Sequence, residues 1–151
     1  MYYQANEGRK RINYLTNEIC ALYHQAAMKF GLSDSALEIL YTLCDEGDRC
    51  PQKIIYQKTG SRRSTINSAI RRLEKEGVLY LEAQDGRSTL VCLTEKGHKL
   101  VKEKAFPLLQ TENEVFSEWT EEERELYLSL TEKYLISFKE KISMLNKEAE
   151  K

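Results

Sequence analysis

The sequence predicts a mainly α-helical protein that carries one small β-hairpin. Apolar residues recur at three- and four-residue spacing through most of the 151 residues, which is typical of amphipathic helices. In residues 78–93 this period gives way to two β-prone runs separated by an Asp-Gly pair, the usual signal of a hairpin. With only 7 glycines and 2 prolines, the chain has little room for a glycine-rich phosphate loop or for many tight turns.

Two helices are expected within residues 9–47, with a short break between them at Gly31. The first covers residues 9–30 and ends at Gly31, because glycine readily takes the left-handed conformation that closes a helix. The second begins after Ser33, whose side chain can accept from the free N–H groups of the first turn, and ends near Gly47. Its expected inner face comprises Leu37, Leu40, Tyr41 and Cys44.

Residues 51–77 have the pattern of two helices joined by a short turn that contains a glycine, which is the helix-turn-helix pattern. A proline opens the first helix, residues 51–58, where its missing N–H costs nothing. The second helix is expected over residues 61–76, with Ser61 as its cap and Gly77 just beyond its end.

The second of these helices has two different faces. Ile66, Ile70 and Leu73 form an apolar stripe, and the other face is short, cationic and rich in hydrogen-bond donors. Such a face suits phosphates and base edges in a major groove, although a solvated amphipathic helix would show the same pattern. The polar face carries Arg62, Arg63, Ser64, Asn67, Ser68 and Arg71.

The hairpin that follows favours the nucleic-acid interpretation of this helix. Its strands are expected within residues 79–93, on either side of the loop from Gln84 to Ser88, with Arg87 at the tip. A helix-turn-helix followed by such a hairpin is a winged helix-turn-helix, and the hairpin is its wing.

The C-terminal part reads as further helix. Thr94 is expected to cap a helix over residues 95–109 that Pro107 bends, and Thr120 with Glu123 forms a capping box for a last helix of about 25 residues. Trp119 is expected to make a staple-type contact at the start of this helix.

Apolar residues of the last helix form a heptad seam, which usually packs against a partner helix. The first helix is equally amphipathic, so internal packing of the two is one alternative. We expect instead a subunit interface, with residues 1–31 and 107–151 as a helical dimerisation region around a DNA-binding domain, residues 32–106. The expected dimerisation residues are Ile12, Leu15, Ile19, Leu128, Leu135, Phe138, Ile142 and Leu145.

Charge is segregated along the chain although the net charge is only −1. Residues 53–87 hold eight basic and four acidic side chains, whereas seven glutamates lie within residues 112–125. A basic middle and an acidic far end allow one part to lie on a polyanion while the other stays away from it.

The cysteines and histidines indicate which functions to exclude. Without a secretory signal or a long apolar run, we expect a cytoplasmic protein with reduced thiols and no membrane partner. No Cys-x-x-Cys pair exists and the two histidines are far apart, so neither a metal site nor a cofactor is expected. We find no nucleophile–base pairing, phosphate loop or paired carboxylates, and therefore do not expect an enzyme.

Three motifs in order resemble the MarR family of bacterial transcriptional regulators. Residues 71–79, Arg-Arg-Leu-Glu-Lys-Glu-Gly-Val-Leu, are similar to the family's helix end before the wing. Residues 85–87, Asp-Gly-Arg, match its Asp-x-Arg wing motif, and residues 93–97, Leu-Thr-Glu-Lys-Gly, match its Leu-Thr-x-x-Gly segment.

The resemblance implies a homodimer that binds a near-palindromic operator on double-stranded DNA, most simply as a repressor that a small-molecule effector relieves. Residues 61–76 would enter the major groove. Arg87 would enter the minor groove, with Asp85 bracing its guanidinium. Asn67, Ser68 and Arg71 are the expected base contacts. The full set of expected DNA-binding residues is Ser61, Arg62, Arg63, Ser64, Thr65, Asn67, Ser68, Arg71, Asp85 and Arg87.

An effector site is expected where the first, second and fifth helices converge, with Tyr23, His24, Tyr41 and His98 as candidate ligand-binding residues; each also suits a core or boundary position. Cys20 is expected to be a buried structural residue rather than a peroxide sensor. The main functional alternative is a winged-helix protein–protein interaction module without DNA binding. A metal-sensing regulator would need clustered Cys and His ligands, and here they are scattered.

Overall fold

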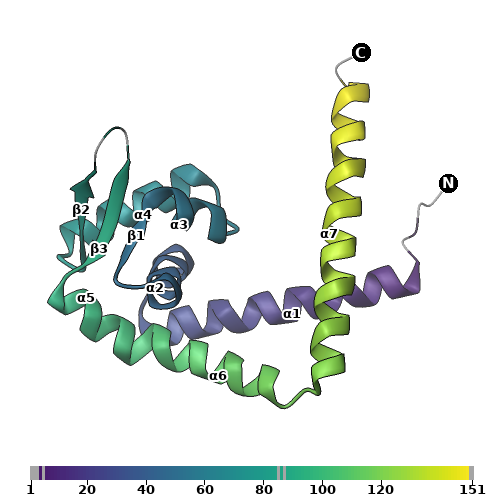
Figure 1. Ribbon diagram of the computed structural model, residues 1–151, viewed down its shortest axis with the longest axis horizontal. Coiled ribbons are helices and arrows are strands. Elements are labelled where there is room, and N and C mark those ends of the chain that lie inside the picture. The colour runs from purple at the N-terminus through teal and green to yellow at the C-terminus, as the bar shows by residue number, and fades with distance from the viewer. Residues whose placement is uncertain (1–3, 5, 85, 87, 150–151) are drawn as a thin grey trace. The chain divides into compact units, whose positions relative to one another are not determined.

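The structure, a computed structural model, describes residues 4, 6–84, 86 and 88–149 (Figure 1). It comprises two compact units, Met1–Leu109 and Gln110–Lys151. The first holds helices α1 to α5 and the sheet, and the second holds α7. Among the described residues, no helix is both long enough and apolar enough to span a membrane.

Helix α1 covers Glu7–Phe30 and begins two residues earlier than expected. The cause is Asn6, whose side chain accepts from the backbone N–H of Arg9 at 2.7 Å. Gly31 closes the helix with a φ of 70°, as expected. The buried position expected for Cys20 is wrong, because this cysteine is exposed on α1.

Helix α2 covers Asp34–Glu46, and Ser33 caps it as predicted by accepting from the N–H of Ala36. Its inner face is wider than expected. The helix packs against α1, against α4 and against the segment that follows α5, so apolar contact extends around it. Tyr41 and Cys44 are only half-buried. The buried apolar residues are Ala36, Leu37, Ile39, Leu40 and Leu43.

The sheet has three strands, where the sequence predicted two. Strands β2 (Leu79–Ala83) and β3 (Thr89–Leu93) form the predicted hairpin, and β1 (Arg49–Pro51) pairs antiparallel with β3 on its other side. A side-chain pair between Arg49 and Glu82, 2.6 Å apart, joins the two outer strands. Strand β1 is the strand that was not predicted.

Helices α3 (Gln52–Lys58) and α4 (Arg63–Lys75) form the predicted helix-turn-helix. The predicted stripe of α4, Ile66, Ile70 and Leu73, is buried in the core with α2 and the sheet. Ser61 does not cap α4, because the helix begins two residues later and Arg62 occupies the cap position.

The end of α4 is as predicted. Gly77 has a φ of 70°, and the N–H of Val78 donates to the carbonyl of Leu73 at 2.9 Å, which is the Schellman arrangement. That bond turns the chain from α4 directly into the wing.

The helix predicted over residues 95–109 continues further. Thr94 caps α5 (Glu95–Leu100), and a π-helical turn, Val101–Ala105, connects it to α6 (Phe106–Ser117). A proline cannot donate a backbone hydrogen bond, and the wider turn just before Pro107 accommodates this without ending the helix.

In the second unit, α7 covers Glu121–Ala149 and begins with the predicted capping box. The Thr120 N–H donates to Glu123 at 2.8 Å, and the Glu123 N–H donates to the Thr120 hydroxyl at 3.2 Å. The Trp119 ring lies 5.2 Å from the ring of Tyr127, edge to face, so the tryptophan packs on the start of α7.

Candidate nucleic-acid interface

The polar face of α4 is open to solvent, opposite its buried stripe. Ser61, just before the helix, is half-buried. Neither Asn67 nor Arg71 points into the interior, as both are exposed. The structure thus gathers the residues predicted for this face on one surface. The exposed members are Arg62, Arg63, Ser64, Thr65, Asn67, Ser68 and Arg71.

The start of α4 is suited to an anion. Arg62, the residue at the cap position, makes no side-chain hydrogen bond to the first N–H groups of this helix. Those groups carry the positive end of the helix dipole, and Arg62 and Arg63 add two exposed guanidinium groups beside them. A phosphate oxygen is the ligand that this combination fits.

A groove of about 580 Å³ lies between α3, the start of α4 and the wing. Its α3 residues are not among the DNA-binding residues predicted from the sequence. The polar residues of α3 could have been predicted as DNA contacts from the sequence, since the first helix of a helix-turn-helix crosses the DNA backbone. The groove is lined by Gln52, Lys53, Tyr56, Gln57, Arg63, Ser88 and Thr89.

Side chains from α3 contact two of the predicted DNA-binding residues. The Arg63 guanidinium lies 4.6 Å from the centre of the Tyr56 ring. The Gln52 amide nitrogen donates to the Tyr56 hydroxyl at 2.6 Å and to Asn67 Oδ1 at 3.4 Å. The two helices therefore present one connected surface.

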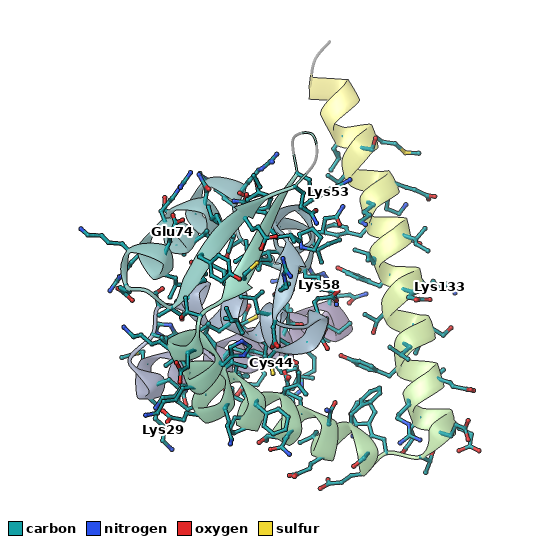
Figure 2. The ribbon with its side chains drawn as sticks, turned by 60° about the vertical axis from the view of Figure 1, so that its left-hand side comes forward. Lys29, Cys44, Lys53, Lys58, Glu74 and Lys133 are labelled. Atoms are coloured by element: carbon teal, nitrogen blue, oxygen red, sulfur yellow. The ribbon has the colours of Figure 1, made fainter. Side chains whose placement is uncertain are left out.

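Two arginines near the end of α4 have carboxylate partners. Arg71 lies 3.2 Å from Glu74, and Arg72 lies 2.9 Å from Glu76, pairs that join residues three and four apart on one helix. Glu74, labelled in Figure 2, lies in the last turn of α4, whereas Arg63 of the groove is the first residue of this helix. In the free protein, the Arg71 guanidinium is thus already paired with the carboxylate of Glu74.

Lys58 is fixed by acidic residues at the end of α2. It pairs with Asp45 at 3.0 Å and with Glu46, and these two bonds raise the pKa of its ammonium group. Lys53, at the other end of α3, lines the groove (Figure 2). Of these two lysines, Lys53 is therefore the one placed to meet a polyanion.

The wing is held by regular pairing from Leu79 opposite Leu93 to Ala83 opposite Thr89. Its loop closes with the Gln84 N–H donating to the Ser88 carbonyl at 3.0 Å. Gly86 has a φ of 87°, which explains the glycine at the tip. Asp85 and Arg87, the two wing residues predicted to contact DNA, lie outside the described residues.

The two histidines predicted to bind an effector, His24 and His98, lie at opposite ends of α2. His24 pairs with Asp34 at 2.9 Å, at the start of α2, while His98 lies 3.5 Å from Asp48, beyond its end. The 13 residues of α2 extend for about 20 Å, so one small ligand cannot contact both histidines. The roles of Tyr23 and Tyr41 in effector binding stay predictions. Burial and the nearby charge of Asp45 raise the pKa of the Tyr41 hydroxyl.

Among the described residues, no three His, Cys, Asp or Glu side chains cluster as metal ligands.

The fold and this surface define a winged helix-turn-helix protein. Residues 30–88 match the model of the MarR family. An uncharacterized HTH-type transcriptional regulator of Bacillus subtilis, YwoH, is 29% identical over 126 residues, covering 83% of this chain and 91% of the relative.

Solved structures of regulators share the fold of this chain. A MarR family regulator from Neisseria meningitidis has a TM-score of 0.73 at 22% identity, over 91% of this chain and 96% of the other. The Staphylococcus aureus regulator MepR, in a complex with DNA, has a TM-score of 0.65 at 23% identity, over 90% of this chain and 99% of the other. Residues 30–88 thus resemble the MarR family, and the comparisons support a DNA-binding transcription regulator.

Proposed function

We propose that this protein binds a near-palindromic operator as a homodimer, with α4 of each subunit in a major groove and each wing in an adjacent minor groove. The observation that carries the proposal is the exposed polar face of α4, which continues through the groove onto α3 and the wing. In such dimers the two recognition helices are about 34 Å apart, one turn of the duplex.

The homodimer is supported by apolar side chains exposed on two helices. On α1 the predicted residues Ile12, Leu15 and Ile19 are 50%, 44% and 52% exposed. On α7 all the predicted seam residues are exposed, from Leu128 to Leu145. Water-exposed apolar stripes of this length mark protein interfaces, and a heptad seam fits another helix. The division into a dimerisation region, residues 1–31 and 107–151, and a DNA-binding domain, residues 32–106, is part of this proposal.

A protein–protein module without DNA binding is the less favoured function. A module that binds only protein does not require two exposed arginines, Arg62 and Arg63, at the start of a helix, nor the exposed polar residues Asn67 and Ser68. We further propose that the protein acts in the cytoplasm as a repressor, with effector control an additional element.

Selection from a pool of random duplexes tests this function. The expected result is two inverted half-sites centred about 10 base pairs apart, with affinity that falls steeply with salt. Candidate small molecules added to the same selection test effector control. Binding without sequence preference, or only by a monomer, would contradict the proposed mode.

A further inference from the structure

Gln52 connects α3 to the face of α4 that would read DNA. Its amide nitrogen carries two N–H groups, and these can serve the Tyr56 hydroxyl at 2.6 Å and Asn67 Oδ1 at 3.4 Å together. Gln52 and Tyr56 are half-buried, whereas Asn67 is exposed. The exposed amide of Asn67 is therefore oriented by a side chain of another helix.

Tyr56 supports Arg63 in a similar way. Its ring lies 4.6 Å from the guanidinium, within the range of a cation–π contact. A free arginine side chain has many rotamers to lose on binding, and a ring on one side restricts them beforehand. Because Tyr56 is also hydrogen-bonded to Gln52, both contacts belong to one cluster, the four residues Gln52, Tyr56, Arg63 and Asn67.

We propose that Gln52 and Tyr56 are positioning residues that set the base preference of Asn67 and Arg63 without reading bases themselves. This inference rests on the proposed function. An asparagine discriminates adenine only if its oxygen and nitrogen face the correct atoms, so a fixed amide orientation bears directly on specificity. A side chain ordered before binding also loses less conformational freedom in the complex.

The first test needs no DNA. In the full-length protein, the side-chain order parameter of Asn67 is expected to fall below about 0.6 in Gln52→Ala and in Gln52→Glu, which cannot donate. Tyr56→Leu is expected to disorder the Arg63 side chain, while Tyr56→Phe, which keeps the ring, is not. The exposed glutamine of α1 gives a matched control, Gln25→Ala, with no change expected. Unchanged order at Asn67 in both Gln52 variants would overturn the positioning role.

The second test is duplex selection with the same variants. Gln52→Ala is expected to lose about tenfold discrimination at the same base pair that Asn67→Ala affects, and the double variant to lose no more than Asn67→Ala alone. An equal loss of affinity for every sequence would make Gln52 a phosphate contact and overturn the inference. If the wild-type protein itself selects no sequence, the proposed function fails together with the inference. If the wild-type protein selects a sequence and the Gln52 variants keep the same preference, the inference alone is refuted.

Discussion

Gly97 lies directly against the backbone carbonyl of Val78, so closely that a β-carbon at position 97 would overlap the carbonyl oxygen. The same oxygen accepts from the backbone N–H of Thr94 at 3.1 Å and from its hydroxyl at 2.9 Å. The first turn of α5 is thereby fixed against the point where α4 ends and the wing begins. This contact explains why the Leu-Thr-x-x-Gly segment needs its glycine.

Gly97→Ala should therefore destabilise the protein. The added methyl group meets backbone rather than a flexible side chain, so we expect the free energy of unfolding to fall by about 2–3 kcal/mol in urea titrations. Gly60→Ala is the matched control, because no atom lies within 4 Å of a β-carbon there. Equal stability of the two variants would contradict the close packing at Gly97.

Glu74→Gln should strengthen DNA binding. The substitution removes a negative charge near the duplex and releases Arg71, which lies 3.2 Å from Glu74 in the free protein. Since exposed ion pairs are worth at most about 1 kcal/mol, we expect a two- to fivefold lower Kd in fluorescence anisotropy. Glu132→Gln, on α7, controls for the change in net charge. Weaker binding by Glu74→Gln would mean that Glu74 orients Arg71 for its contact.

Asn67→Ala and Arg62→Ala should have different effects. Asn67→Ala is expected to relax preference at one base pair by about 1–3 kcal/mol, whereas Arg62→Ala weakens binding to all sequences and lowers the salt slope by about one. Affinities measured for the selected site and single-base variants at several salt concentrations separate the two. A uniform loss for Asn67→Ala would reassign it to the phosphate backbone.

Leu135→Glu should impair dimerisation. The side chain is 49% exposed on the seam of α7, and a carboxylate there would be desolvated if a second copy covers it. We expect the dimer dissociation constant to rise at least tenfold in analytical ultracentrifugation. Ser129→Glu introduces the same charge on another face of α7 and should leave the dimer intact. A dimer equally stable in both variants would place the interface elsewhere.

Alkaline pH should lower stability. Burial raises the pKa of the Cys50 thiol, and burial with Asp45 raises that of Cys44, from a usual value of 9.0. A folded-state pKa above the unfolded value means that the stabilisation is complete below the unfolded pKa and is lost as the pH rises through the folded one. The free energy of unfolding should therefore be lower at pH 9.5 than at pH 7. This decrease should be smaller in Cys44→Ala than in the wild-type protein. A flat profile would contradict the shielding of these thiols.

Local signals in the sequence predicted most of the fold. Ser33, Thr94 and Thr120 all cap the helices that they were expected to cap, because each capping bond spans only three residues. The prediction that Ser61 caps α4 was wrong, because a serine before a helix does not show by itself where the first turn begins. Pro107 was expected to bend a helix that ends near residue 109, but the helix continues through a π-helical turn to Ser117.

Contacts between elements were harder to predict. The polar face of α4 followed from helical periodicity, and the structure keeps it exposed. The contributions of Gln52 and Tyr56 depend on how α3 meets α4, and Gln52 lies 15 positions from its partner Asn67. Strand β1 is only three residues long, and its pairing with β3 spans some forty positions, so no local pattern signals it.

Pro51 belongs to two elements at once, since it ends β1 and flanks the first residue of α3. Strand β1 also pairs with β3 of the wing, so one peptide bond separates the wing sheet from the helix that carries Gln52. In the proposed binding mode, we therefore expect the shape of the minor groove at the flank of a half-site to influence which base is preferred at its centre.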